Sequence, residues 1–226
     1  MSKKIFYSEL AYVAGILLLA LGTALMAQAD FGLSMIVAPA YIIHLKVSQV
    51  LPFFTFGMAE YTFQGLLILL MVLLLRKFKL SYLFSFVTAI VYGFALDGCM
   101  LLAGLIPADA MAVRVLLYVV GTLLCTAGVA FMFHTYISPE AYELFVKEVS
   151  AAYHVEIHRF KIGYDLVSCV VSILLSFALF GFGHFEGIKL GTVLNALMNG
   201  WLIGIYSKQF ERRLEFRDAL PLRKHF

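Results

Sequence analysis

The stretch Leu10–Ala29, LAYVAGILLLALGTALMAQA, decides the class of this protein because none of its residues carries a charge. About 20 consecutive apolar residues in a helix cross the hydrocarbon core of a bilayer once. A cleavable signal peptide has a shorter apolar core with a small-residue cleavage site behind it, whereas this run is long and further apolar runs follow it. The stretch is therefore predicted to be a retained first membrane helix.

The composition of the 226-residue chain agrees with a membrane protein, because 62% of its residues are hydrophobic and only 14% are charged. A soluble domain usually has about 25% charged residues. Apolar windows of bilayer length predict six membrane-spanning helices, near residues 8–29, 53–75, 81–106, 111–134, 162–183 and 187–206. The expected fold class is thus an all-α polytopic membrane protein, and any binding chemistry lies within the membrane or on short loops.

The basic residues predict the orientation of these spans, since cytoplasmic loops of membrane proteins carry an excess of Lys and Arg. With six spans, 14 of the 17 basic residues fall on the side of the N-terminus, and only Lys46, Arg114 and Lys189 fall on the other side. Both termini are therefore expected in the cytoplasm. The net charge of +3 is small and the basic residues lie at helix ends, a distribution that does not fit nucleic-acid binding.

Two segments between the spans are predicted to be short helices that do not cross the membrane. Residues 138–153 have an amphipathic pattern, with Ser138 as N-cap and Pro139 in the first turn, which is typical of a helix lying on the cytoplasmic face. Residues 34–44 are more apolar but too short to cross, and we expect an interfacial or re-entrant helix on the outer side.

A shift of the sequence by 106 residues against itself indicates an internal repeat. The shift aligns Gly22, Ala24 and Met26 with Gly128, Ala130 and Met132, Gly57 with Gly163, and Gly98 with Gly204. Each half also has the same order of elements, a span, a short helix and two further spans. Because three crossings start the second copy on the opposite side, residues 1–106 and residues 107–226, the latter with a basic cytoplasmic tail, are predicted to be inverted repeats.

Short motifs link the chain to a known group of proteins. The first span contains Gly22-Thr23, the turn Phe31-Gly32-Leu33-Ser34 follows it, and the last span contains Gly191-Thr192 through Asn199-Gly200. These motifs resemble the YitT/YczE-like family of small bacterial integral membrane proteins. The resemblance implies a transporter-like protein in the bacterial plasma membrane, and it implies neither a substrate nor a catalytic motif.

Polar side chains at membrane depth are the candidate binding residues, because each is costly there unless it is paired or lines water. Six of them are predicted to lie between the outer surface and the midplane and to line one cavity: Gln28, Glu60, Gln64, Asp97, Asn195 and Asn199. Two carboxylates and several amides suit a small cationic or polar solute, and a desolvated carboxylate that takes up a proton would couple transport to the proton gradient. In the alternative interpretation, the amides join helices and the carboxylates reach water near the outer surface.

Three functions fit these features. The first is a secondary transporter or solute-binding membrane protein. The second is the substrate-binding subunit of an energy-coupling-factor transporter, in which an ATPase module would dock on a small-residue pattern such as Ala20-x-x-x-Ala24. The third is a non-transporting membrane scaffold, whose basic C-terminal tail would bind anionic lipid or a partner.

Other chemistry is not expected. The sequence has no zinc-binding helix motif, nucleophile elbow or phosphate-binding loop, so we expect no enzymatic activity, cofactor or metal. The three cysteines lie in separate apolar segments, which does not fit a disulfide framework. Small-residue patterns such as Gly200-x-x-x-Gly204 are typical of packing within the bundle, with a homodimer interface as the alternative.

Overall fold

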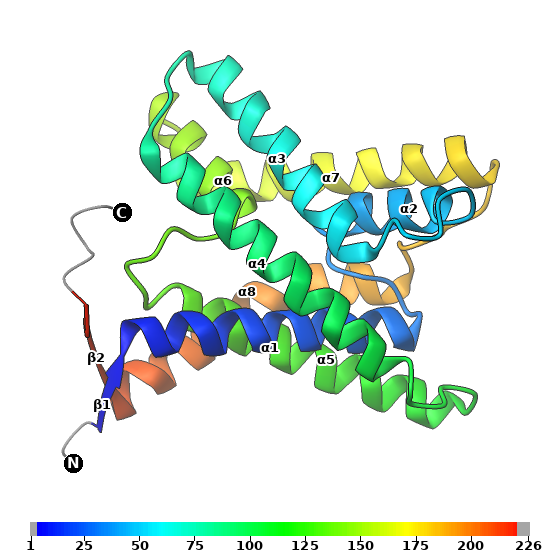
Figure 1. The fold of residues 1–226 in the computed structure, drawn as a ribbon, viewed down its shortest axis with the longest axis horizontal. Coiled ribbons are helices and arrows are strands. Elements are labelled where there is room, and N and C mark those ends of the chain that lie inside the picture. Colours follow the sequence, from blue (N-terminus) through cyan, green and yellow to red (C-terminus); the bar gives the residue numbers. More distant parts are fainter. Residues whose placement is uncertain (1–3, 221–226) are drawn as a thin grey trace.

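The computed structural model describes residues 4–220 as a bundle of eight helices with two short strands at one end (Figure 1). Lys3, Arg223 and Lys224, which belong to the predicted cytoplasmic charge, lie outside the described residues. In chain order the elements are β1 (Lys4–Tyr7), α1 (Ser8–Ala29), α2 (Ala38–Val47), α3 (Phe56–Leu75), α4 (Leu80–Ala103), α5 (Met111–Met132), α6 (Ala141–Ala152), α7 (Ile157–Phe180), α8 (Leu190–Arg213) and β2 (Leu214–Arg217).

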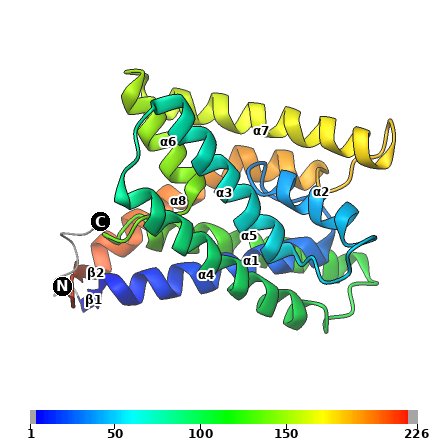
Figure 2. The same cartoon turned by 45° about the horizontal axis from the view of Figure 1, so that its top comes forward.

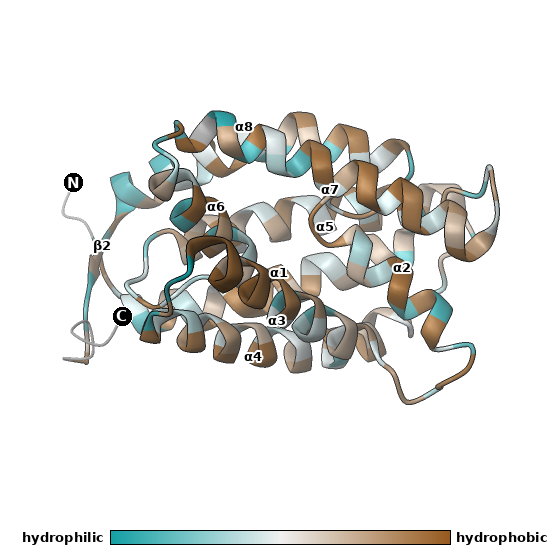
Figure 3. Ribbon diagram, turned by 90° about the horizontal axis from the view of Figure 1, so that it is seen from above, coloured by the Kyte–Doolittle hydropathy of each residue, from teal (hydrophilic) through white to brown (hydrophobic). Residues whose placement is uncertain are grey.

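Five helices of the described chain, α1, α3, α4, α5 and the part of α7 from Arg159, are long and apolar enough to cross a membrane. Brown, the colour of hydrophobic residues in Figure 3, runs along much of α4 and α7. Large apolar side chains that are more than half exposed lie on all five of these helices, for example Leu17, Leu66, Phe94, Leu101, Leu116 and Leu174. Apolar surface of this extent does not suit water. The prediction of a helical protein is confirmed, and the five candidate spans agree with the prediction of a membrane protein.

The sixth predicted span corresponds to α8, which is less apolar than the other five and is not among the candidate spans of the described chain. Two amides, Asn195 and Asn199, interrupt its apolar sequence, and its last turn carries Glu211, Arg212 and Arg213. The helix is nevertheless 24 residues long, as long as α4 and α7. Five candidate spans are thus established, and the sixth crossing remains a prediction.

The two short helices exist where the sequence predicts them, but they are more buried than expected. Figures 1 and 2 show them at opposite ends of the bundle, α6 beside α3 and α2 beside the far end of α7. The apolar face of α6 is covered by protein, because Tyr142, Phe145 and Val149 are buried against α3 and the partly buried Phe160 of α7. Its location on the cytoplasmic face stays a prediction. Its apolar face packs on helices of the bundle instead of on lipid.

Helices α1 and α5 form the central contact of the bundle and run antiparallel, since Arg114 near the start of α5 bonds the carbonyl oxygen of Ala29 at the end of α1. Glycines allow the two backbones to meet. A Cβ atom on Gly22 would lie 2.6 Å from the carbonyl oxygen of Gly121, and one on Gly128 would lie 2.7 Å from that of Gly15. The shift of 106 residues pairs Gly22 with Gly128 and Gly15 with Gly121, so it converts each of these two contacts into the other.

The packing of the other helices follows the same pattern. Helix α1 packs on α4 as α5 packs on α8, α3 packs on α6 as α7 packs on α2, and α2 packs on α3 as α6 packs on α7. There are two exceptions among the described residues, because α3 packs on α4 and α4 packs on α6, whereas neither α7 with α8 nor α8 with α2 packs to the same extent. The other helix contacts named here have a counterpart in the other half.

The strands β1 and β2 pair in parallel, from Lys4 opposite Leu214 to Tyr7 opposite Arg217, a contact that the sequence analysis does not predict. Next to them, both carboxylate oxygens of Glu9 accept backbone N–H bonds from Ala219, and one also accepts from Leu220. The two ends of the described chain are thus joined at one end of the bundle.

Two of the motifs behind the family resemblance contact each other at the opposite end. The backbone N–H of Gly191 donates to the carbonyl oxygen of Phe31 at 2.9 Å, and a Cβ atom on Gly32 would overlap the side chain of Thr192. Gly32 also has φ +98°, a left-handed conformation that glycine adopts without strain. This turn therefore positions the start of α8 beside the end of α1.

Candidate functional site

Two carboxylates, an amide and a phenol meet in the buried contact between α3 and α6. Glu60 and Gln64 lie one turn apart on α3, and both are fully buried, with 0% of each residue exposed. The hydroxyl of Tyr142 on α6 donates to Oε2 of Glu60 at 2.9 Å. Nε2 of Gln64 donates to the same oxygen at 3.3 Å.

The second carboxylate belongs to Glu140, the N-cap residue of α6, which is 5% exposed. Nε2 of Gln64 also donates to Oε2 of Glu140 at 3.4 Å, while Oε1 of Gln64 accepts from the backbone N–H of Ala141 at 3.1 Å. One amide therefore bridges a carboxylate from residues 1–106 and a carboxylate from residues 107–226. We refer to Glu60, Gln64, Glu140 and Tyr142 as the Glu60–Glu140 site.

Hydroxyl groups of α4 hold the beginning of α6 in this position. Ser85 Oγ donates to the carbonyl oxygen of Pro139 at 2.6 Å, and Thr88 Oγ1 donates to that of Ser138 at 3.0 Å. The predicted N-cap role of Ser138 is wrong, because Glu140 occupies that position and the helix begins at Ala141. The segment before α6 is thereby fixed against α4, and Glu140 is directed into the bundle.

The hydrogen bonds of the Glu60–Glu140 site leave one oxygen of each carboxylate unsatisfied. Oε1 of Glu60 and Oε1 of Glu140 are buried and have no hydrogen-bond partner among the described residues. No described Lys, Arg or His side chain forms an ion pair with either carboxylate. Burial raises the pKa of Glu140 well above its ordinary value, and the negative charges of Glu143 and Glu60 raise it further. Such a pair favours a bound proton or another cation.

A cavity of about 250 Å³ lies beside this site, between the end of α5, the segment leading to α6, and the start of α7. Its wall includes Pro139, which precedes Glu140, Glu143, which lies one turn after it, and the residues Lys147 and Lys161. Burial raises the pKa of Glu143, whereas the positive charge of Lys161 opposes that rise. The cavity is at the end of the bundle that carries β1, because Phe6 stacks on Phe131 near the end of α5.

Asp97, a predicted site residue, binds the N-terminus of α3. Its Oδ2 accepts from Thr55 Oγ1 at 2.6 Å, and its Oδ1 accepts from the backbone N–H of Gly57 at 2.7 Å. The first N–H groups of a helix lack intrahelical partners and favour a negative charge. Asp97 therefore has a structural role at the α3–α4 contact, where Gly57 and Gly93 allow the backbones to meet.

The predicted amides outside α3 also have other surroundings. Gln28 donates to the carbonyl oxygen of Ile106 at 3.0 Å, and Asn195 lies 3.9 Å from the sulfur of Met26 on α1. Oδ1 of Asn199 is buried without a described partner. Of the six predicted residues, the hydrogen bonds join only Glu60 and Gln64 directly. A solute cavity shared by all six remains a prediction.

Sequence reasoning missed Glu140 and Tyr142. It placed both on a helix exposed to the cytoplasm, where a carboxylate needs no explanation. The available signal was the apolar content of that segment, because Tyr142, Phe145 and Val149 recur at helical spacing and can be buried by protein as well as by lipid. That signal marks a buried face, but it does not identify the helix that covers it.

Comparison with known proteins gives one match. Residues 6–208 match the model described as a family of unknown function, DUF6198. No curated protein and no solved structure matches the chain.

Proposed function

The chain belongs to the DUF6198 family of unknown function, and we propose that it is a secondary transporter for a small cationic or polar solute. The observation that carries this proposal is the Glu60–Glu140 site, in which two buried carboxylates each leave one oxygen unsatisfied. An intramembrane carboxylate is expensive and usually serves an ion or substrate pathway. In this proposal the site binds the solute between the two halves of the chain.

The repeated packing pattern supports an alternating-access mechanism. In many transporters, inverted repeats rock against each other around a fixed site at their interface. Here Glu60 and Gln64 come from the first predicted repeat, and Glu140 and Tyr142 come from the second. We propose that residues 1–106 and 107–226 are such repeats, and that movement of α6 relative to α3 exposes the site.

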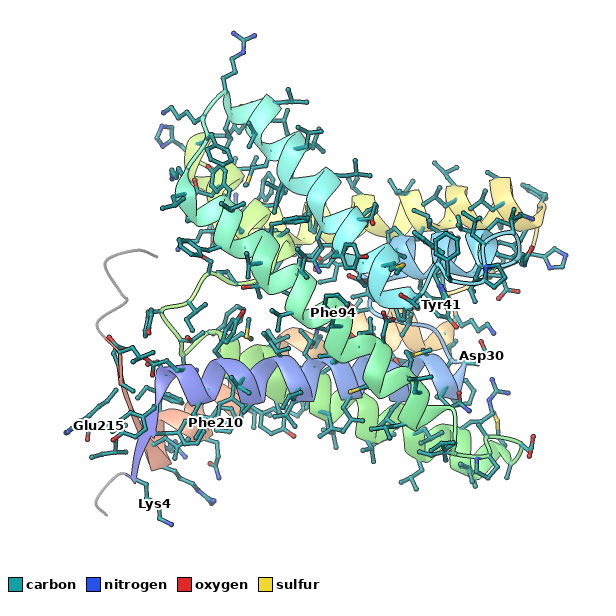
Figure 4. The ribbon with its side chains drawn as sticks, in the orientation of Figure 1. Lys4, Asp30, Tyr41, Phe94, Phe210 and Glu215 are labelled. Atoms are coloured by element: carbon teal, nitrogen blue, oxygen red, sulfur yellow. The ribbon has the colours of Figure 1, made fainter. Side chains whose placement is uncertain are left out.

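The charges at the two ends of the bundle support six crossings with both termini in the cytoplasm. Figure 4 shows Asp30 at the end opposite Lys4 and Glu215. Asp30 pairs with Arg114 at 3.1 Å and with Lys189 at 2.6 Å, so two of the three basic residues at that end share one carboxylate. Helix α8 runs from Lys189 at this end to Glu211, which lies 3.5 Å from His134 at the other, and we propose it as the sixth span.

The resemblance to the YitT/YczE-like family, and with it the bacterial plasma membrane, belongs to this proposal. We also propose that the chain is not an enzyme and that it acts on a small molecule within the bilayer. The energy-coupling-factor and scaffold hypotheses make different predictions. Co-purification with an ATPase module would favour the former, and phenotypes that persist without Glu60 would favour the latter.

Purified protein in liposomes tests the transport function. Vesicles that contain the wild type should take up radiolabelled small amines or polar solutes selected by a thermal-shift screen, since a ligand of the folded state raises its stability. Glu60→Gln should abolish uptake while the protein keeps its elution volume in size-exclusion chromatography. Asp109→Asn removes an exposed carboxylate and should transport as the wild type does. Absence of stabilisation by every solute, together with absence of uptake, would contradict the proposal.

A further inference from the structure

The energy of the Glu60–Glu140 site depends on whether a proton or another cation is bound to its two carboxylates. Its donors, Tyr142 and Gln64, all bond the Oε2 oxygens, and both Oε1 oxygens remain free among the described atoms. With both carboxylates ionised and nothing bound, two negative charges would be buried without a described cation. That state is too costly to be populated in a low-dielectric interior. A positive charge must therefore be present at every stage of a transport cycle.

We propose that the Glu60–Glu140 site exchanges a proton for a small protonated amine, so that the protein is a proton/amine antiporter. This inference rests on the transport function proposed above. In the exchange, a carboxylic acid of the pair loses its proton to water, and the ammonium group of the amine donates N–H bonds to the two free Oε1 oxygens. The net charge of the site is the same before and after. Release of the amine requires that a proton return.

The donor set distinguishes an ammonium group from a divalent metal ion. Calcium takes six to eight oxygen ligands and magnesium requires near-octahedral coordination, whereas this site offers two free carboxylate oxygens. An ammonium group needs only two or three acceptors. The rings of Phe63 and Tyr142, whose centroids are 6.3 Å apart, are next to the site and suit the alkyl part of the amine and its charge.

The groups around the pair set the pH range of the exchange. The negative charge of Glu143 on α6 favours protonation of Glu140, while Lys161 on α7 pairs with Asp165 at 3.8 Å and partly offsets Glu143. The remaining titratable groups that act on the pair, or on which it acts, are uncharged near neutral pH: Tyr12 on α1, Tyr92 on α4, Cys125 on α5, Tyr142 on α6 and Tyr164 on α7. The surroundings of the pair therefore contain no described cation that would replace the proton.

The cavity beside Glu143 gives the proton its route to water. It borders Pro139, which directly precedes Glu140, and Glu143, which lies one turn after it, and its wall also includes Lys147 and Lys161. Glu143 is the carboxylate between this cavity and Glu140, so it is the expected relay. It touches neither Glu60 nor the free oxygens among the described contacts, which makes it a positioning residue for the proton and not a ligand of the amine.

Proton release on binding is the direct test. Propylammonium chloride is added to the detergent-purified protein in weakly buffered solution, and the bulk pH is followed with an indicator dye while calorimetry gives the amount bound. We expect about one proton released per amine bound, and an apparent affinity that rises about tenfold per pH unit while the site is protonated. The rise should end once the empty site has lost its proton, and the affinity should fall above about pH 10, where the amine itself loses its proton. Sodium chloride at the same concentration should release none.

Variants assign the effect to the pair. Glu60→Gln and Glu140→Gln should each weaken propylammonium binding about tenfold to a hundredfold, since each removes a charged acceptor. The double variant has no carboxylate left at the site, so it should neither bind propylammonium nor release a proton. Glu143→Gln should slow proton release with little change in affinity. Asp109→Asn should match the wild type. If the first two variants do not fold, labelling of the wild type by a hydrophobic carbodiimide, which attacks protonated carboxyl groups, should modify Glu60 or Glu140 and be prevented by propylammonium.

The outcomes separate this inference from the transport function. Binding of propylammonium without proton release, or no binding between about pH 5 and pH 9, overturns the antiport inference. Uptake of another solute into liposomes would leave the transport function intact in either case. Conversely, stoichiometric proton release without any uptake would support the chemistry of the site and contradict transport.

Discussion

The contact of α3 with α6 and the contact of α7 with α2 have the same place in the two halves and differ in chemistry. In α3 the buried side chains one turn apart are Glu60 and Gln64, which reach across to α6. In α7 the buried positions at the same spacing are serines, and the hydroxyl of Ser172 bonds the carbonyl oxygen of Ser168 in its own helix at 2.8 Å. One contact joins the halves through ionisable groups, and the other does so through apolar packing.

From this difference we propose that the predicted repeat supplies a scaffold and that solute binding is confined to one copy of it. The α2–α7 contact is built on Ala38, Ile42 and Ile188, with Ile173 and Leu179 packed around them. The side chains of this contact carry no charge and need no hydrogen-bond partner, so the contact does not depend on protonation. The Glu60–Glu140 site has unsatisfied oxygens and changes energy with its protonation state, so it is the side on which we expect movement.

The largest expected effect comes from two glycines that are aligned by the repeat but have different surroundings. A Cβ atom on Gly57 would overlap the carbonyl oxygen of Gly93, whereas one on Gly163 would meet nothing within 4 Å. Gly57→Ala should lower the free energy of unfolding by about 3 kcal/mol or prevent folding. Gly163→Ala should be neutral or stabilising by about 0.5–1 kcal/mol through helix propensity. Thermal unfolding in detergent measures the stability of both variants. Equal effects would contradict the expected difference between the crowded Gly57 and the open Gly163.

The second prediction concerns pH. Burial raises the folded-state pKa of Glu140 above its ordinary 4.5, so the folded protein holds this proton more tightly than the unfolded chain does. The corresponding stability is fully present below about pH 4.5 and is lost as the pH rises through the folded-state pKa, with a slope of up to about 1.4 kcal/mol per pH unit.

Melting temperatures across the neutral range test this sign, because Glu140→Gln should flatten the decline. Asp109→Asn, which changes an exposed carboxylate, should leave the slope as in the wild type. A wild-type melting temperature that rises with pH in this range would contradict the assignment.

The third prediction separates Asp97 from the Glu60–Glu140 site. Asp97→Asn keeps an acceptor for Thr55 or Gly57 but removes the negative charge at the N-terminus of α3, and should cost about 1–2 kcal/mol of stability. Solute binding should persist, because Asp97 has no described contact with Glu60 or Glu140. Calorimetric titration of the folded variant checks this. If binding is lost at unchanged stability, Asp97 belongs to the solute site, as the sequence analysis expects.

The smallest effect is expected in α7, at its apolar contact with α2. Ser172→Ala removes a hydroxyl that bonds only its own helix backbone, so stability should change by less than about 1 kcal/mol and binding should not change. A strong loss of transport in this variant, measured as uptake into liposomes, would show that the α2–α7 contact also moves.

Several features of this protein were predictable because they depend on neighbours in the chain. The apolar runs indicate helices and a membrane, and their spacing predicts both short helices to within a few residues. Glu60 and Gln64 are placed on one face by their four-residue separation alone. By contrast, the pairing of β1 with β2 and the surroundings of Asn195 were not predictable, since they join residues far apart in sequence.

The sequence by itself determined the class of the protein, the order of its helices and the presence of costly carboxylates at membrane depth, since hydropathy and helical spacing are local properties. Only the tertiary structure decided which carboxylates meet. Glu140 is indistinguishable in sequence from a solvated residue at the start of a surface helix. It is buried because Ser85 and Thr88 of α4 hold the preceding carbonyl groups, and because α3 presents Gln64 to bridge it to Glu60.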